Sequence, residues 1–392
     1  LVIVKEAEDA AYFQNSLQNI TGTLEILYFP SSFKNKKNFS QVNSSHIMLR
    51  TEALTKIASG GNKKILVTHA DALFEKVVLS NTLFENTIHI QQAEELDIDA
   101  LLEKFVDYGF EKTDFVYEPG QFAIRGGIVD IYSFGNEKPY RIELFGKEVD
   151  SIRIFNPETQ LSERKLLQVN IIPNIDTQFE ATEKVSLLEF LPSNTVLWIE
   201  DWAYVKERLE QMEEELDVFL LGVSHEPFDQ NNIPETFEVK KEQPASKGDF
   251  ISARLLEQQL IQKHIIEFGK KTSFNGSAQK ILFNTAPQPA FNRNFSMLIK
   301  DLQEHEKNQY NIFIFADQAR QLERLHSIFS DLKAELQITP IPVSIHEGFV
   351  DHALKLVCYT DHQIFQRYHK YKVKQAFNKN KALTLKTLRE LQ

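Results

Sequence analysis

The order of apolar and polar positions first predicts an α/β region. In residues 1–87, short apolar runs alternate with stretches whose apolar residues recur at helical spacing. This alternation is typical of a sheet with parallel strands and crossover helices. The stretch 31–46, rich in Ser, Asn and Lys, predicts an exposed loop. The predicted strands are 1–4, 24–29 and 64–68, and the predicted helices are 7–19 and 50–59.

The pattern changes near residue 88. A helix is predicted at 93–108, and after it apolar and polar residues alternate with period two, which is typical of half-buried strands. Gly126-Gly127 and Gly146-Lys147 predict tight turns between these strands. The stretch therefore predicts a small antiparallel α+β domain. Its predicted strands are 120–125, 128–132, 140–145 and 149–155.

The α/β alternation returns near residue 171 and continues to the end. It predicts a strand at 195–199, a charged helix at 204–221 and a long helix at 249–269 capped by Asp249. A further βαβ module starts near residue 291, and a basic helical pattern fills 362–389. The module's predicted helices are 295–307 and 317–332, and its predicted strands are 311–315, 341–345 and 353–360.

These patterns predict an α/β protein with an inserted domain. A parallel-sheet domain is formed by 1–87 and 173–290, and a small antiparallel α+β insert occupies 88–172. A separate, smaller α/β domain follows at 291–375, and a linker helix at 376–392. The chain has no initiator Met and starts inside a predicted strand, so we expect a fragment of a longer protein.

Charge and composition exclude several classes of protein. The net charge is −11, and 88–172 holds 16 acidic against 9 basic residues, so a uniformly basic nucleic-acid binder is excluded. Only 291–392 leans basic, with 15 Lys and Arg against 11 acids. No apolar run is long enough to cross a membrane, and no signal peptide is present. The single cysteine, Cys358, fits a cytoplasmic protein and excludes an internal disulfide.

A search for catalytic motifs finds none. The chain has no Gly-x4-Gly-Lys-Ser/Thr loop to hold phosphates, and no histidine or cysteine pattern that would bind a metal. Glu200-Asp201 follows a buried strand, where nucleoside triphosphatases place magnesium-binding acids, but it equally fits a solvated strand end. Cys358 lies in an apolar strand pattern and is interpreted as a core residue rather than a nucleophile.

One face of the insert carries candidate binding residues. If Ile142 and Leu144 face the core, then Arg141, Glu143 and Phe145 face outward, and Arg125 joins them. Arginine and aromatic residues are enriched at protein interfaces, so this face fits a partner-binding patch. It equally fits a surface charge lattice of Arg141, Glu143 and Arg125, with Phe145 packed under a loop.

The insert resembles a module shared by UvrB, the helicase-like subunit of bacterial excision repair, and the bacterial transcription-repair coupling factors (Mfd). Both carry Gly-x-Phe-x-x-Arg-Gly-x-x-x-Asp/Glu-Ile/Leu-Phe/Tyr, followed by Arg-x-Glu/Asp-x-Phe. Pro119 and Ala123, where UvrB has basic residues, favour the coupling factors. The matching residues are Gly120, Phe122, Arg125, Gly126, Asp130, Ile131, Tyr132, Arg141, Glu143 and Phe145.

The resemblance implies a docking role. The parallel-sheet domain would be a degenerate, helicase-like relic without ATPase activity or cofactor, with Glu200 and Asp201 as remnants of its magnesium site. The insert would bind UvrA through a set of contact residues, and the protein's own C-terminal domain would mask this surface at rest. The full-length bacterial protein would be an ATP- and magnesium-dependent translocase acting on RNA polymerase and duplex DNA. The implied contact residues are Arg125, Arg141, Phe145, Glu143, Gly127 and Ile128.

Two alternatives stay open. The first is a UvrB-like ATP-dependent DNA helicase domain, which a nucleotide-binding assay would detect. The second is a DNA-binding module that uses the basic segment near the C-terminus, which otherwise fits a solvated linker helix. The candidate DNA contacts in that segment are Arg367, Lys370, Lys372 and Lys374.

Overall fold

The structure is a computed structural model that describes residues 1–35, 38–61, 63–175, 179, 181–223, 245–274 and 279–368. The described residues fall into two compact units. The first contains 1–10 and 27–273, and the second contains 11–26 and 274–368. The predicted α/β fold class with an antiparallel insert is confirmed.

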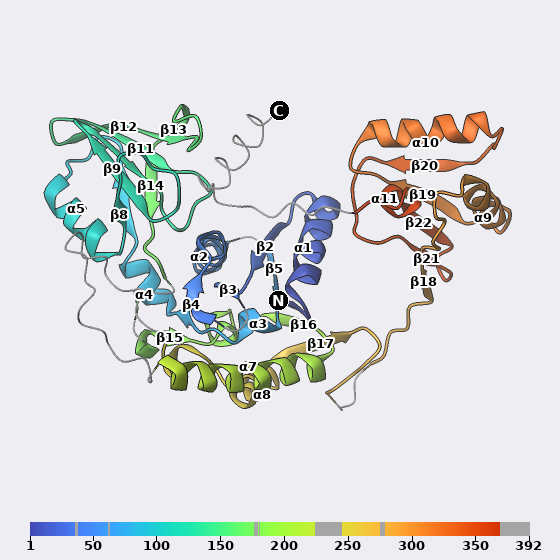
Figure 1. Ribbon diagram of the computed structural model, residues 1–392, viewed down its shortest axis with the longest axis horizontal. Helices are drawn as coiled ribbons and strands as arrows, with labels where there is room; N and C mark the ends of the chain where they lie inside the picture. The colour runs from blue at the N-terminus through green and yellow to red at the C-terminus, as the bar shows by residue number, and fades with distance from the viewer. Residues whose placement is uncertain are drawn as a thin grey trace. The chain divides into compact units, whose positions relative to one another are not determined.

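A five-stranded parallel sheet organises the first unit, in the order β17-β16-β1-β5-β2 (Figure 1). The central strand β1 (Val2–Val4) pairs in parallel with β5 (Lys64–His69) on one side and β16 (Val196–Glu200) on the other. The pairing joins segments nearly 200 residues apart, so everything between them is an insertion or a crossover. The outer strands are β2 (Glu25–Phe29) and β17 (His264–Phe268).

Helices accompany this sheet. Asn43 caps α2 (Ser44–Ala58) by accepting hydrogen bonds from the Ser45 and His46 amides. Helices α7 (Trp202–Val223) and α8 (Ala253–Leu260) lie side by side (Figure 1), joined by Glu257, which accepts from Trp202 Nε1 at 3.1 Å. The shorter elements are α3 (Ala70–Leu73), α4 (Ser80–Glu85), α6 (Leu187–Phe190), the paired strands β6 (Val77–Val78) and β15 (Lys184–Val185), and two 3-10 turns (Ala181–Glu183, Lys247–Asp249).

The predicted loop at 31–46 is wrong. The chain forms a hairpin there, β3 (Phe33–Asn35) with β4 (Asn38–Val42). Two aromatic residues in this polar stretch account for the difference, because Phe33 and Phe39 pack edge to face at 5.4 Å and both contact the ring of Phe250. A local polar composition did not reveal this long-range packing.

The predicted long helix at 249–269 is also wrong. Ser252, not Asp249, caps α8, by accepting from the Leu255 amide at 3.3 Å. The Asp249 carboxylate instead pairs with Lys184 at 2.8 Å. The helix ends at Leu260, and His264–Phe268 joins the parallel sheet as β17 beside β16. β-branched Ile265 and Ile266 favour this strand.

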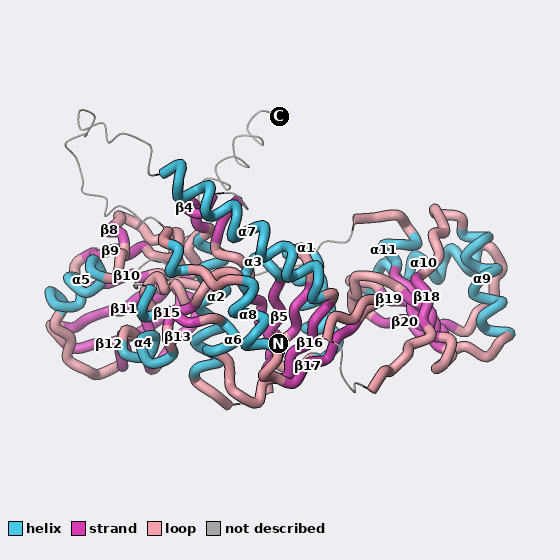
Figure 2. Tube along the Cα trace, turned by 90° about the horizontal axis from the view of Figure 1, so that it is seen from below, coloured by secondary structure: helices cyan, strands magenta, loops and turns pink. Residues whose placement is uncertain are grey.

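The insert contains a six-stranded sheet in the order β13-β12-β11-β10-β9-β8, with α5 (Ile98–Asp107) next to it (Figures 1 and 2). Helix α5 is shorter than predicted because Asp97 caps it and Ala93–Leu96 runs along the start of β12, with the Ala93 amide donating to Val149 O at 2.9 Å. The strands are β8 (Glu111–Lys112), β9 (Gln121–Arg125), β10 (Ile128–Ile131), β11 (Tyr140–Phe145), β12 (Glu148–Phe155) and β13 (Ser162–Leu166).

The predicted antiparallel strands of the insert are therefore confirmed. One face of the sheet covers a core that includes Phe105 of α5, Phe122 and Ile142, all buried. A two-stranded ribbon, β7 (Ile88–Gln91) with β14 (Gln168–Ile171), carries the chain into the insert and out of it. The alternation of buried and exposed positions fixes which side chains lie on the opposite face.

The second unit is built on a mixed sheet in the order β18-β21-β22-β19-β20. The strand predicted at 353–360 begins later, at Leu356, after a turn that joins it to the preceding strand. The strand predicted at 341–345 is displaced, because the observed strand is Ile338–Ile341 and shares only Ile341 with the predicted range. β18 lies before residue 291, the predicted start of the third domain. The elements are β18 (Thr285–Pro287), α9 (Phe295–Lys307), β19 (Asn311–Phe315), α10 (Ala319–Asp331), β20 (Ile338–Ile341), β21 (Phe349–Asp351), β22 (Leu356–Thr360) and α11 (Asp361–Ile364).

Most of helix α1 (Ala7–Thr21) also belongs to the second unit. Its Asn19 side chain donates to Ser344 O at 2.9 Å, and the Tyr12 ring stacks on His346 with centroids 3.6 Å apart. The basic helix predicted at 362–389 and the linker helix predicted at 376–392 lie largely or wholly outside the described residues, because the description ends at Tyr368.

Candidate partner-binding face

The candidate residues gather on the face of the six-stranded sheet that lies opposite α5, here called the outer face. Cross-strand register places Asp130 beside Arg141, and Arg141 beside Arg153. Two residues before Asp130 on the same strand, Ile128 lies beside both Arg125 and Glu143. The sheet thus presents charged residues from four neighbouring strands on one surface.

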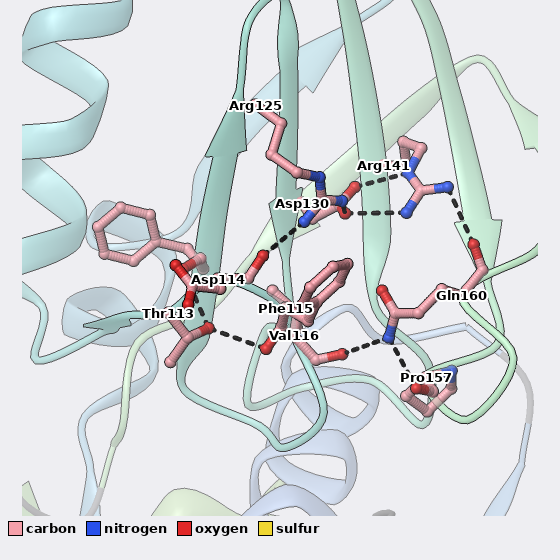
Figure 3. A network of polar contacts seen from close by, with 10 residues as sticks. Thr113, Asp114, Phe115, Val116, Arg125, Asp130, Arg141, Pro157 and Gln160 are labelled. Atoms are coloured by element: carbon pink, nitrogen blue, oxygen red, sulfur yellow. Dashed lines mark hydrogen bonds and ion pairs between the residues drawn. The ribbon is translucent and has the colours of Figure 1, made fainter.

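Asp130 is the centre of this face (Figure 3). Its side chain is fully buried, on β10 between the strands that carry the two arginines. Arg141 donates from Nε to Asp130 Oδ1 at 2.7 Å and from Nη2 to Oδ2 at 2.9 Å. Arg125 pairs with the same carboxylate from the other side. One buried anion therefore holds two cations, which is the condition under which a buried charge is tolerated.

Further contacts fix both guanidinium groups. Arg141 stacks 4.6 Å from the centroid of Phe155 and donates to Gln160 O at 3.1 Å. Arg125 stacks 5.0 Å from Phe115 and donates to Asp114 O at 2.7 Å (Figure 3). The hydrogen bonds to Asp130 raise the pKa of Arg141 above its ordinary value, so this group stays charged at every physiological pH.

The two arginines differ in exposure. The Arg141 side chain is 15% exposed and the Arg125 side chain is 35% exposed. Arg141 therefore offers a partner only the rim of its guanidinium, and much of its contribution is structural. Arg125 keeps a larger part of its surface for an external contact.

Glu143 does not join this cluster. Its carboxylate accepts from Ser151 Oγ at 2.7 Å and pairs with Arg153 at 3.0 Å. The sequence left open a charge lattice of Arg141, Glu143 and Arg125. In the structure the acid that joins the two arginines is Asp130 and not Glu143. Sequence reasoning noted Asp130 only as a motif position and missed Arg153. Only the register of the strands could have found both.

Phe145 is the most exposed apolar residue among those predicted for the site, with 84% of its surface accessible. It ends β11 just before the Gly146-Lys147 turn, so the alternative in which it packs under a loop is wrong. The turn between β9 and β10 holds the end of β11 that carries Phe145, since the Leu144 amide donates to Gly127 O at 2.8 Å. A Cβ on Gly127 would lie 2.9 Å from Leu144 O, so only glycine allows this approach.

The far end of the outer face is closed. Ala123 lies on the same side of β9 as Arg125 but is buried with Val116, Tyr132 and Phe155 in a second small core. The accessible part of the face is therefore the end near the two hairpin turns, which carries Phe145 and the half-buried Ile128, with Ile128 opposite both Arg125 and Glu143.

The acidic pair at the end of β16 has lysine partners. Glu200 pairs with Lys5 at 3.0 Å, and Asp201 lies 3.4 Å from Lys271. Asp201 also accepts from the Tyr204 amide at 3.3 Å, at the start of α7. These contacts are those of a strand end and a helix start. In the described part of the chain, no group of three or more His, Cys, Asp and Glu side chains could hold a metal ion.

The remaining candidates lie near the end of the described chain. Arg367 pairs with Asp361 in the second unit. Lys370, Lys372 and Lys374 lie outside the described residues, so their prediction as DNA contacts is untested. None of the helices in the described ranges is long and apolar enough to cross a membrane.

The insert and the whole chain both resemble known proteins. Residues 88–176 match the family model described as the UvrB interaction domain. The transcription-repair-coupling factor of Bacillus subtilis is 24% identical over 400 residues, covering 86% of this chain and 33% of that protein. The one from Borreliella burgdorferi is 26% identical, covering 88% and 32%. The one from Staphylococcus epidermidis strain RP62A is 21% identical, covering 100% and 38%.

Over most of its length the chain is similar to transcription-repair-coupling factors. It spans about a third of the length of these relatives. The match to the UvrB interaction domain contains the whole outer face, including Asp130, both of its arginines and Phe145.

Removing the two arginines that pair with Asp130 should destabilise the sheet by unequal amounts. Arg141→Ala should lower the free energy of local opening of the six-stranded sheet by about 3 kcal/mol, because a buried carboxylate loses its bidentate partner. Arg125→Ala should cost about 1 kcal/mol, since Arg125 is more exposed and Arg141 remains. Hydrogen exchange of the amides in 121–131 and 140–155 measures both. Equal losses would contradict the account.

Cys358 should be unreactive in the folded chain. It is buried in β22, and burial, with a smaller effect from the charge of Asp351, raises the pKa of its thiol to about 11. Its alkylation by iodoacetamide near pH 8 should be at least about 100-fold slower than in the unfolded chain, because only the thiolate reacts. Mass spectrometry gives one signal per chain, and comparable rates before and after unfolding would contradict the buried position.

Proposed function

We propose that this chain is a non-catalytic docking region whose inserted domain binds UvrA through the exposed end of its outer face. The observation that carries the proposal is Phe145. A phenylalanine with 84% of its surface accessible is unusual on a solvated surface, and here it lies on the same sheet face as two fixed arginines in a domain related to the UvrB interaction domain.

The contacts that hold Arg141 and Arg125 in place support a docking role. Holding a long side chain in one conformation on binding costs conformational entropy, and Asp130 and the stacked rings of Phe155 and Phe115 hold Arg141 and Arg125 beforehand. Such preorganised guanidinium groups favour charge-assisted hydrogen bonds to carboxylates. Phe145 then supplies the apolar anchor at the centre of the contact.

The charges indicate the chemistry of the partner surface. The outer face carries the cations Arg125, Arg141, Arg153 and Lys165 against the anions Asp130, Glu143 and Glu148, and Glu148 lies directly opposite Phe145. The insert as a whole is acidic, with 16 acidic and 9 basic residues, so this face differs from its surroundings. A complementary surface on UvrA would bring carboxylates around an apolar socket for Phe145.

The wider roles belong to the same proposal. In a longer protein related to the coupling factors, this region would bring UvrA to stalled RNA polymerase during transcription-coupled repair. A separate ATP-driven motor would act on duplex DNA, and the protein's own C-terminal domain would cover the docking face at rest. The lysine partners of Glu200 and Asp201 favour a docking region over a helicase domain for this chain.

Phe145→Ala tests the docking site without disturbing the fold. Because Phe145 is exposed, its loss should leave the thermal stability unchanged, while the affinity for UvrA should fall by roughly 30-fold or more, which corresponds to about 2 kcal/mol for a hot-spot aromatic residue. Isothermal titration calorimetry of the chain with purified UvrA measures the affinity.

Phe84→Ala is the matched control. Phe84 lies on α4, outside the outer face, and 69% of its surface is accessible. Its replacement removes the same side chain and should change the UvrA affinity less than about twofold. If both variants bind UvrA as tightly as the unchanged chain, the outer face is not the docking site. If the unchanged chain does not bind, the docking proposal itself fails.

A further inference from the structure

A second cluster of arginines lies in the second unit, far along the chain from the outer face. A hollow of about 630 Å³ opens beside α10. Three of its lining residues are the arginines Arg320, Arg324 and Arg367, and its only lining carboxylate among the described residues is Glu323. We call these three residues the arginine cluster.

The fold brings the cluster to one edge of the mixed sheet. Strands β19 and β22 lie side by side and run parallel, so their carboxyl ends meet at the same edge. The chain leaves β19 into α10, which carries Arg320 and Arg324, and leaves β22 through α11 to Arg367. In open α/β sheets this is the edge at which ligands bind.

A buried ring and a buried acid hold two of the arginines in place. The guanidinium carbons of Arg324 and Arg367 each lie 5.0 Å from the ring centroid of Phe365. Phe365 is itself buried and packs on Phe295. Arg367 also pairs with the carboxylate of Asp361, which is 3% exposed. Two guanidinium groups are thus fixed at one aromatic ring, and Asp361 compensates the charge of Arg367 but not that of Arg324.

Unlike Arg367, the other members of the cluster have no acid that neutralises their charge locally. Arg320 and Arg324 are exposed, one turn apart on α10, and neither has a carboxylate within salt-bridge distance among the described residues. Ser327 follows on the same side of the helix and adds a hydroxyl donor to the hollow. Asp361 is occupied by Arg367, so Glu323 and the exposed Asp317 remain as the nearby acids.

We propose that the arginine cluster binds phosphate groups of a nucleic-acid backbone. Guanidinium groups match phosphate oxygens with paired hydrogen bonds and stay charged. The hollow lacks a glycine-rich phosphate loop, and guanidinium groups already stack on the Phe365 ring, so neither a nucleotide pocket nor a base platform is present there. From residue 368 to residue 392 the sequence adds seven Lys and Arg against one acid, which suits a repeated phosphate backbone.

The test is a salt-dependent titration of the complete 392-residue chain with fluorescein-labelled duplex DNA, followed by fluorescence anisotropy. The double variant Arg320→Gln/Arg324→Gln should weaken binding about 10-fold and reduce the slope of log affinity against log salt by about 2, one for each lost phosphate contact. Arg320→Lys/Arg324→Lys should keep most of the slope, because the charges remain. A second duplex of different sequence should bind equally, since backbone contacts carry no sequence information.

Lys300→Gln/Lys307→Gln is the matched control. Both lysines are exposed on α9, and neither lines the hollow, so this variant changes the net charge equally and should alter binding less than about twofold. Three results would overturn the proposal: no binding by the unchanged chain, unchanged binding by the Arg→Gln variant, or an equal loss in the control. Unchanged thermal melting and unchanged UvrA affinity in the Arg→Gln variant exclude unfolding and separate this site from the docking face.

Discussion

The carboxylate of Asp130 is the interaction on which the outer face depends. A fully buried anion must be compensated, and Arg141 and Arg125 compensate it from the strands on either side. This requirement ties β9, β10 and β11 together by charge as well as by backbone hydrogen bonds. It also fixes two guanidinium groups on the face of the sheet whose end carries the exposed Phe145. The same carboxylate thus supports the fold of the insert and prepares its surface for a partner.

The contacts on the outer face distinguish residues that hold the surface in place from residues that a partner can touch. Arg141 is mostly covered, Gly127 lets two hairpins approach closely, and Glu143 is neutralised by Arg153. Phe145 and the exposed part of Arg125 remain as the groups that a partner can reach. A loss of binding after replacing Arg141 would therefore mix two causes, disturbance of the sheet and loss of a contact, whereas Phe145 reports on contact alone.

Local patterns predicted much of the fold, and long-range contacts decided the rest. The period-two strands of the insert were predictable because the turns between β9 and β10 and between β11 and β12 are short and contain glycine. The hairpin at 33–42 and the strand His264–Phe268 were not, because distant aromatic residues and a distant strand stabilise them. Period-two alternation grouped Arg125, Arg141, Glu143 and Phe145 on one face, and a family resemblance supplied their expected role. The role of Asp130 required the register that places it beside Arg141.

The most direct test of the docking account is a hydrogen-exchange footprint of the intact chain with and without UvrA. The account predicts slower exchange in the two hairpin turns at 125–129 and 143–149, which end the outer face near Phe145. It predicts no change in the second unit, at 279–368. Protection confined to the second unit, or to the parallel sheet of the first, would contradict the assignment of the outer face as the UvrA-binding surface.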